Sequence, residues 1–272
     1  MAEIKKILIA NRGEIVQRAI RTIKEMGKKS VAVYSAGDKN ASYLKHADEA
    51  VCIGGAKSSE SYLNIPALIT AAEMTGCDAI FPGYGFLSEN QDFVEICKLH
   101  NIKFIGPSSE VMEKMADKSK AKEEMVKAGV PVVPGSKGAV RTLDEGKKIA
   151  REIGYPIMAK ASAGGGGRGM RLIKEEKDFD SQYLAASSEA LAAFGDGTMY
   201  LERFINNPRH IEVQVIGDSH GNAIHIGERD CSLQRRHQKV IEESPAILLN
   251  EETRAKLHEV AVKATKYLKY AG

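Results

Sequence analysis

The sequence predicts an α/β protein: a doubly wound parallel sheet at the N-terminus, then a smaller α+β unit and the start of an antiparallel sheet. Two observations lead to this fold class. Short apolar runs alternate with helical patterns through residues 1–105, which is typical of a parallel sheet covered by helices. After the Pro- and Gly-containing stretch 130–135, two predicted strands instead flank a glycine-rich loop.

The elements of the parallel sheet follow from periodicity. Strands are expected at 7–10, 31–34, 50–53, 79–81 and 103–105, and helices at 14–26, 65–75, 93–100 and 108–128. Asn64 is expected to cap the second helix, with Pro66 in its first turn and Gly76 beyond its end. The turns at 11–13 and 83–85 follow strands at their carboxyl ends, where such sheets bind ligands. Both turns are therefore candidate ligand contacts.

The second part of the chain reads as a small α+β unit followed by an antiparallel pair. Strands are expected at 156–161, 170–173, 199–202, 210–216 and 223–226, and helices at 144–153, 175–193 and 251–270. The mixed charge run 227–243 holds too few apolar residues for a core strand. We expect that run to be a polar segment rather than part of the core.

Composition argues against several classes of protein. With 39 basic and 36 acidic residues, the net charge of +3 gives no reason to expect nucleic acid or a membrane surface as partner. The four cysteines show neither a CxxC pair nor metal-ligand spacing, so we expect reduced thiols and no metal site. The first residues are too briefly apolar for a signal peptide, and no later run could span a bilayer. A cytoplasmic protein is expected.

The loop 164–169 carries the strongest chemical signal. Five of its six residues are glycine, and the strand that precedes it carries Lys160. Backbone N–H groups in such a loop can wrap closely around an anion. A surface hairpin is the alternative, although so many glycines cost conformational entropy. Neither a Walker A sequence nor a helix-opening GxGxxG pattern is present. A lysine-bearing strand entering a strand-to-strand glycine loop instead resembles the lid of ATP-grasp enzymes.

Two further segments are candidate binding sites. Residues 202–214 read as a strand that ends in an acid, a turn and a second strand, which an ordinary hairpin would also explain. The run 227–243 is either a solvated surface or a site for a small anion such as bicarbonate or phosphate. Its clustered cations are Arg235, Arg236, His237 and Lys239. Cys231 lacks a plausible base arrangement, so we interpret it as a structural thiol rather than a nucleophile.

Five motifs occur together in one order: IANRGEI at 9–15, PGYGFLSEN at 82–90, GGGGRGM at 164–170, NPRH at 207–210 and ERDCSLQRRHQK at 228–239. This ordered set closely resembles the biotin carboxylase family, which includes the biotin carboxylase subunit of bacterial acetyl-CoA carboxylase and the corresponding part of pyruvate and propionyl-CoA carboxylases. The resemblance covers essentially the whole chain. It implies an ATP-grasp fold with a Rossmann-like pre-ATP-grasp domain over 1–116, a helical linker over 117–131, a lid over 132–203 and the start of a C-terminal antiparallel subdomain over 204–272.

The resemblance also implies site residues. ATP contacts are expected from Lys118, Lys160, Gly166, Gly167, Glu202, Arg203, Phe204, Ile205, His210, Gln234 and His237. Lys239 matches the catalytic lysine that contacts bicarbonate or the reacting carboxyl group. Tyr84 matches a tyrosine that lines the biotin and bicarbonate pocket. The glycine loop is expected to move with the lid over bound nucleotide.

The implied reaction is the ATP- and bicarbonate-dependent carboxylation of biotin on a carrier protein. Bicarbonate attacks the γ-phosphate to give carboxyphosphate, and the CO2 released from it is captured by N1 of biotin. ATP and Mg2+ are the implied cofactors, and biotin is a carrier-bound substrate. The implied partners are biotin carboxyl carrier protein, carboxyltransferase subunits and a second copy in a homodimer.

One departure from the family concerns the end of the chain. In the family, the magnesium-binding acids, the catalytic arginine and the general base lie beyond the position of Gly272. We therefore expect a fragment that does not catalyse the reaction, with an exposed sheet edge, uncovered apolar surface and distorted or re-paired strands after residue 203.

Other functions stay open at this stage. Another ATP-grasp ligase, such as a carbamoyl-phosphate synthetase domain or a purine-pathway carboxylase, shares the lid pattern, and a non-catalytic nucleotide-binding module is a second alternative. The sequence does not distinguish an acetyl-CoA from a pyruvate carboxylase.

Overall fold

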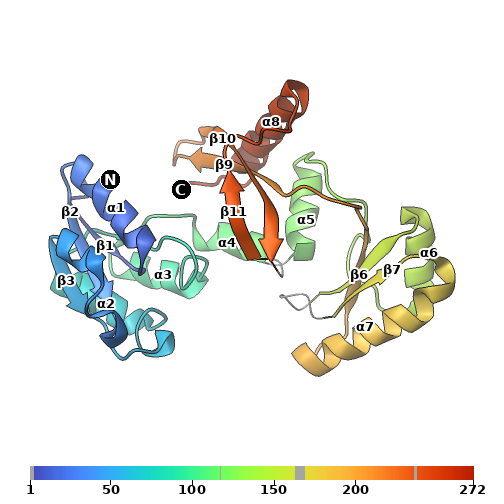
Figure 1. The fold of residues 1–272 in the computed structure, drawn as a ribbon, viewed down its shortest axis with the longest axis horizontal. Coiled ribbons are helices and arrows are strands. Elements are labelled where there is room, and N and C mark those ends of the chain that lie inside the picture. The colour runs from blue at the N-terminus through green and yellow to red at the C-terminus, as the bar shows by residue number, and fades with distance from the viewer. Residues whose placement is uncertain (1–2, 117, 163–168, 236–237) are drawn as a thin grey trace. The chain divides into compact units, whose positions relative to one another are not determined.

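The computed structural model describes residues 3–116, 118–162, 169–235 and 238–272 (Figure 1). The chain divides into two compact units, Met1–Glu113 with Tyr270–Gly272 and Lys114–Lys269. Each unit has its own sheets and its own buried core. Each is therefore described by itself.

The first unit is a five-stranded parallel sheet in the order β3-β2-β1-β4-β5. Its strands are β1 (Lys6–Ile9), β2 (Lys29–Tyr34), β3 (Glu49–Cys52), β4 (Ala79–Phe81) and β5 (Lys103–Phe104), and the alternating helices are α1 (Glu14–Glu25), α2 (Ile65–Met74) and α3 (Gln91–Leu99). Val16 and Ile20 of α1 belong to one core cluster, and Leu68 of α2 and Phe93 of α3 to another. Alternate residues of β1 supply the two clusters, so helices cover both faces. The predicted doubly wound parallel sheet is confirmed.

The helix ends show the capping that the sequence suggests. The side chain of Asn64 accepts a hydrogen bond from the N–H of Ala67 at 3.1 Å, as predicted. Asn90 caps α3 in the same way, with the N–H of Phe93 at 2.8 Å. Within the segment 108–128, expected to be helical, the structure describes α4 (Ser109–Ala116) and α5 (Lys118–Lys127), and the residue between them lies outside the described ranges.

Residues 132–203 of the second unit contain an antiparallel sheet in the order β7-β6-β8. Its strands are β6 (Ile157–Ala161), β7 (Met170–Ile173) and β8 (Met199–Arg203), and its helices are α6 (Leu143–Ile153) and α7 (Phe179–Phe194). Ile157, Leu201 and Phe179 are fully buried between the sheet and these helices. One face of the sheet is thus covered. Helix α7 begins later than the predicted residue 175 because Glu176–Asp178 form a separate 3-10 turn.

The other sheet of the second unit has the antiparallel order β11-β10-β9. Its strands are β9 (Ile211–Gly217), β10 (Ala223–Arg235) and β11 (Gln238–Glu243), and α8 (Glu251–Tyr267) packs on one face. The expectation that strand structure ends at Ile226 was wrong. Register shifts break the period-two alternation within β10, and the charged residues Arg229, Glu212 and Lys239 pair with one another on the sheet. Because residues 227–243 are rich in charge, the sequence did not predict the later part of β10 or any of β11.

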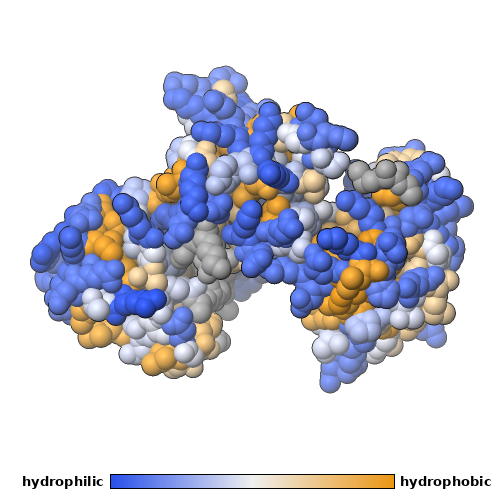
Figure 2. Space-filling view, turned by 180° about the vertical axis from the view of Figure 1, so that it is seen from behind, coloured by the Kyte–Doolittle hydropathy of each residue, from blue (hydrophilic) through white to orange (hydrophobic). Residues whose placement is uncertain are grey.

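The expectation for residues 204–272 is only partly met. Strands β9, β10 and β11 pair as one antiparallel sheet, with register shifts between His225 and Glu228 and between Asp230 and Gln234. Apolar side chains are nevertheless exposed there, among them Ile224 at 57% and Val240 at 60%. On the face shown in Figure 2, hydrophobic residues form separate patches within a largely hydrophilic surface. Within the described ranges, no helix combines the length and the apolar character needed to cross a membrane.

A buried carboxylate joins α8 to its sheet. Glu228 of β10 is 2% exposed and accepts hydrogen bonds from Nε of Arg254 at 2.8 Å and from Nε2 of His258 at 2.7 Å. The ring of His258 in turn stacks on that of His225, with centroids 3.9 Å apart. Burial alone would raise the pKa of Glu228, but the two hydrogen bonds outweigh burial and hold the pKa below its usual value. The ionised carboxylate therefore stabilises the docking of α8.

Replacing Glu228 by glutamine is expected to lower the free energy of unfolding at pH 7 by about 1 to 3 kcal/mol, because hydrogen bonds to a charged group are lost. Since the folded pKa is depressed, this stabilisation is present above the unfolded value of about 4.3 and is lost as the pH falls through the folded value. The difference in free energy of unfolding between the wild type and Glu228→Gln, measured with urea, should therefore be smaller at pH 3 than at pH 7. Glu252→Gln, on α8 with a side chain 77% exposed, is the control. An equal difference at both pH values would contradict the prediction.

Candidate functional site

The sheet of residues 132–203 leaves one face open. Ile157, Ala159 and Leu201 point to the buried face, so the alternate residues of each strand point the other way. The register pairs Lys160 with Tyr200 and with Met170, and directly opposite residues share a face. The open face therefore presents Met158, Lys160, Met170, Leu172, Tyr200 and Glu202.

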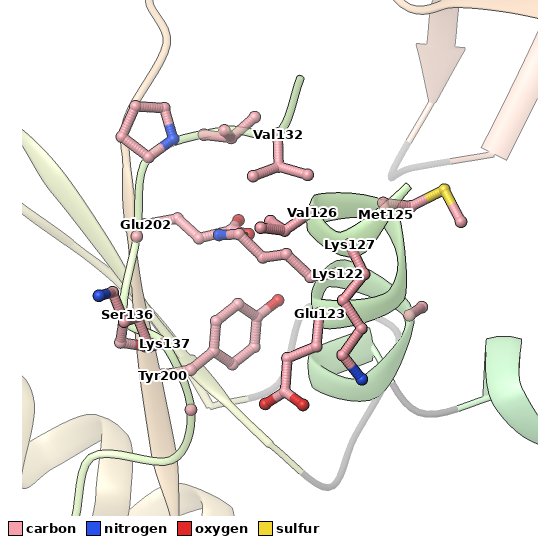
Figure 3. Close-up of a pocket in the computed structure, with 15 residues that line it drawn as sticks. Lys122, Glu123, Met125, Val126, Lys127, Val132, Ser136, Lys137, Tyr200 and Glu202 are labelled. Carbon is pink, nitrogen blue, oxygen red and sulfur yellow. The ribbon is translucent and has the colours of Figure 1, made fainter. Parts of the chain in front are cut away.

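Charged residues gather on this open face around Glu202. Nζ of Lys160 lies 2.6 Å from Oε2 of Glu202 and 5.7 Å from the centre of the Tyr200 ring. Nζ of Lys122, from α5, lies 3.4 Å from Oε1 of the same carboxylate. Figure 3 shows the side chains of Lys122 and Glu202 pointing toward each other from α5 and β8. Two cations thus share one acid.

A cavity of about 820 Å³ opens beside this cluster. One wall is α5, with Met125 and Val126, and the opposite wall is the segment 132–138 with Tyr200 and Glu202 of β8 (Figure 3). Apolar side chains thus line much of a space that ends at a charged cluster. A flat, partly apolar group with polar edges suits such a space.

Residues 202–205, expected to contact ATP, form the end of β8 and the two positions after it. The N–H of Arg203 donates to the carbonyl of Pro134 at 2.8 Å, and that of Phe204 donates to Pro156 at 3.0 Å. These two N–H groups are therefore already paired. The side chain of Arg203 donates to the carbonyl of Ile153, and Ile205 is 49% exposed.

A second cluster lies on β9–β11. Glu228 points toward α8, so the neighbouring Arg229 and its register partner Glu212 face away from that helix. Glu212 forms ion pairs with Lys239 and, at 2.9 Å, with Arg229. Nδ1 of His210 lies 2.7 Å from the side-chain nitrogen of Gln234. The structure thus brings together the predicted residues His210, Gln234 and Lys239.

The ion pairs of this cluster shift the pKa values of both partners. Burial alone would raise the pKa of Glu212, but hydrogen bonds from Lys239 and Arg229 hold it below its usual value. The hydrogen bond to Glu212 raises the pKa of Lys239. Lys239 therefore stays a cation at neutral pH and suits a small anion. Cys231 is fully buried and burial raises the pKa of its thiol, in line with the structural interpretation.

Tyr84 belongs to the first unit and is 60% exposed. Its hydroxyl donates to Glu14, and that hydrogen bond raises its pKa. Asn11 fixes the loop, since its amide donates to the carbonyls of Pro82 at 2.7 Å and Tyr84 at 2.8 Å. The turns after β1 and β4 are therefore joined, as expected for a site at the carboxyl edge of the sheet.

Several predicted residues lie outside the described parts. These are Gly166, Gly167 and His237, together with the side chain of Lys118, whose backbone is in α5. Gly169, at the end of the loop, is described and has a φ of +65°. A Cβ there would lie 2.9 Å from Cβ of Ala161, so this glycine allows the loop to return close to the sheet.

Three residues of the two clusters were missed from sequence. Glu212 and Arg229 were detectable in principle, because period two places Glu212 on the same side of its strand as His210. Lys122 gave no signal, since it is one of several lysines on an exposed helical pattern.

A doubly wound parallel sheet, followed by a sheet with a lysine before a glycine loop and by a second antiparallel sheet, defines the ATP-grasp class. The comparisons narrow that class. The family model for the biotin carboxylase N-terminal domain matches residues 3–112, and that for the carbamoyl-phosphate synthase L chain ATP-binding domain matches residues 117–272. The biotin carboxylase of Nostoc sp. is 56% identical over 98% of this chain and 60% of its own length. Biotin carboxylase 1 of Bacillus subtilis is 50% identical over 99% of this chain and 60% of its own length.

Solved structures that resemble the chain are also biotin carboxylases or biotin carboxylase domains. The biotin carboxylase–beta-gamma-ATP complex of Campylobacter jejuni is 69% identical with a TM-score of 0.90, covering 99% of this chain and 60% of that one. The biotin carboxylase domain of Hydrogenobacter thermophilus 2-oxoglutarate carboxylase, with MgADP, ADP and bicarbonate, is 48% identical with a TM-score of 0.86, covering 100% and 60%. The chain belongs to the biotin carboxylase family. It spans about 60% of the length of these relatives.

Proposed function

We propose that the complete gene product containing this chain carboxylates biotin on a carrier protein, using ATP and bicarbonate through carboxyphosphate. The observation that most supports the proposal is the pairing of Lys160 with Glu202 on an open sheet face, where Lys160 lies on the strand that leads directly into the glycine loop. The Campylobacter jejuni relative, described as a beta-gamma-ATP complex, aligns with 99% of the chain. The 2-oxoglutarate carboxylase domain was solved with both MgADP and bicarbonate, which supports binding of an adenine nucleotide and bicarbonate here.

In this proposal the residues around Lys160 hold the nucleotide. Lys160 and Lys118 bind the phosphates, and the loop glycines close over them as the lid moves. The nucleotide contacts are Lys118, Lys160, Gly166, Gly167, Glu202, Arg203, Phe204, Ile205, His210, Gln234 and His237. Lys239 is the catalytic lysine: its charge attracts bicarbonate and offsets the negative charge that develops as the carboxyl oxygen attacks the γ-phosphate. Tyr84 lines the biotin pocket.

Magnesium belongs to the proposed reaction but is assigned no ligand here. Within the described ranges, no group of three or more His, Cys, Asp or Glu side chains could hold a metal ion. When bound with ATP, the metal neutralises phosphate charge. The contribution of this chain is cationic: Lys160 and Lys239, each already paired with an acid, suit anionic phosphate and bicarbonate.

The remaining expectations from the sequence are part of the same proposal. Biotin carboxyl carrier protein and carboxyltransferase subunits are the proposed partners, and the complete product is proposed to be a homodimer. The four-part division at residues 116, 131 and 203 is likewise proposed. Which acyl-CoA or oxo-acid carboxylase is served depends on the carboxyltransferase.

Bicarbonate-dependent ATP hydrolysis by the purified complete gene product tests the proposal. Stimulation by free biotin, with carboxybiotin detected by 14C-bicarbonate incorporation, is the expected result. Turnover that needs an amine donor instead of biotin would favour a different ATP-grasp ligase. ATP binding without turnover would favour the non-catalytic nucleotide-binding module. The 272-residue chain assayed alone is expected to show no biotin-dependent hydrolysis, and turnover equal to that of the complete product would contradict this expectation.

A further inference from the structure

The carboxylate of Glu202 is divided between two lysines. Oε2 pairs with Lys160 at 2.6 Å, and Oε1 pairs with Lys122 at 3.4 Å. Only 18% of the Glu202 side chain is exposed, against 29% for Lys160 and 20% for Lys122. A carboxylate so far withdrawn from water needs at least one cation beside it.

The segment that faces α5 leaves space for the ammonium group of Lys122. Gly135 forms an isolated bridge with Glu202, and a Cβ on Gly135 would lie 2.7 Å from Nζ of Lys122 and 2.5 Å from the carbonyl of Leu201. Glycine at this position thus leaves the space that the ammonium group occupies. Met125 and Val126 of α5 line the same cavity (Figure 3).

We propose that Lys122 is a positioning residue of the nucleotide site: it keeps Glu202 paired when Lys160 turns from Glu202 toward the phosphates of ATP. This inference rests on the proposed function and names the step by which the site changes on binding. Lys122 does not itself contact the nucleotide.

The physical reason is a competition for one lysine. Lys160 is bound to Glu202, and turning toward phosphate breaks that contact. Without a second cation, the partly buried carboxylate would be left unpaired, and that cost would subtract from ATP affinity. Because Lys122 lies on the other carboxylate oxygen, it can close its 3.4 Å separation as Lys160 departs. Lys122 thus lowers the cost of nucleotide binding.

The test measures ATP dissociation constants and steady-state kinetics in the complete gene product. Lys122→Met is expected to raise both the Kd and the KM for ATP by about tenfold while kcat changes by less than about twofold, because binding is weakened uniformly. Lys122→Arg should restore most of the affinity. Lys147→Met is the matched control, since this lysine of α6 also pairs with one carboxylate, that of Asp180 at 2.8 Å, but does not line the cavity.

A double variant separates positioning from a simple structural contact. In a Glu202→Gln background there is no carboxylate to neutralise, so adding Lys122→Met should change the ATP dissociation constant by less than about twofold. An unchanged ATP affinity in Lys122→Met, failure of arginine to restore it, or full additivity with Glu202→Gln would overturn the inference.

Failure of this inference is distinguishable from failure of the proposed function. A wild-type protein that binds ATP without biotin-stimulated turnover overturns the function alone, because the dissociation constants still report on Lys122. Normal biotin-stimulated turnover, together with an ATP dissociation constant that Lys122→Met leaves unchanged, overturns the inference alone. A wild-type protein that does not bind ATP overturns both.

Discussion

Replacing Lys160 by glutamine in the complete gene product is expected to lower kcat/KM for ATP at least about tenfold, because one charge-assisted contact to phosphate is lost. Lys160 is the charged residue that β6 carries on the open face, directly before the loop that returns at Gly169. Its pairing with Glu202 shows that the ammonium group is directed along that face rather than into the core. Initial rates at varied ATP concentration measure the effect.

The control for Lys160 is Lys174→Gln, an exposed lysine just after β7 in the same unit. It removes the same charge from the same unit, at a position beyond the end of the strand. Thermal unfolding of both variants checks that the lid is intact, since its core of Ile157, Leu201 and Phe179 is untouched. Unchanged kcat and KM in Lys160→Gln would show that the phosphates bind elsewhere.

Much of the fold could be predicted because local signals agree with the final structure. The strand 7–10 is apolar throughout, and it is buried in β1 of a sheet covered on both faces. Asn64 caps its helix through a contact three residues away, which requires no knowledge of the rest of the molecule. Such elements are determined by short stretches of sequence.

The strands β10 and β11 show where this reasoning fails. All of β11 is exposed, and Lys239 and Glu242 on it take part in ion pairs across the sheet. A one-sided sheet with charged residues on its open face has the composition of a surface loop. The ion pairs of the site were missed for a related reason: Glu212 and Arg229 pair with residues 27 and 17 positions away, respectively, and period two can indicate the face of a residue but not its partner.

The residues predicted by resemblance and the residues found by geometry complement each other. Resemblance indicated Lys160, Glu202 and Lys239, whereas the structure added the ion pairs that orient their side chains. Lys122 could not be inferred at all, since its role depends on the packing of α5 against the segment of Gly135. Tertiary contacts between separate elements therefore account for what sequence reasoning missed.

Lys239→Gln is expected to reduce bicarbonate-dependent ATP hydrolysis by about a hundredfold, with a smaller effect on ATP binding. A fixed cation aimed at developing negative charge contributes to the transition state more than to the ground state. Lys239 is held in place by Glu212, which Arg229 fixes from the other oxygen at 2.9 Å. Lys256→Gln, on α8 with a side chain 70% exposed, is the control. A fall in ATP affinity without a fall in kcat would contradict a catalytic role.

Glu212→Gln supplies the pH test of the same cluster. The hydrogen bond from Lys239 to Glu212 raises the pKa of Lys239, so the cation persists to higher pH while Glu212 is present. Removing the carboxylate should lower that pKa and move the alkaline limb of the pH–rate profile to lower pH. The acid limb should stay where it is, because Lys239 is protonated throughout that range. Rates measured from pH 6 to pH 12, a range that includes the ordinary lysine pKa of about 10.4, decide the matter. An alkaline limb that does not move in Glu212→Gln would show that Lys239 is not the cation on which the rate depends.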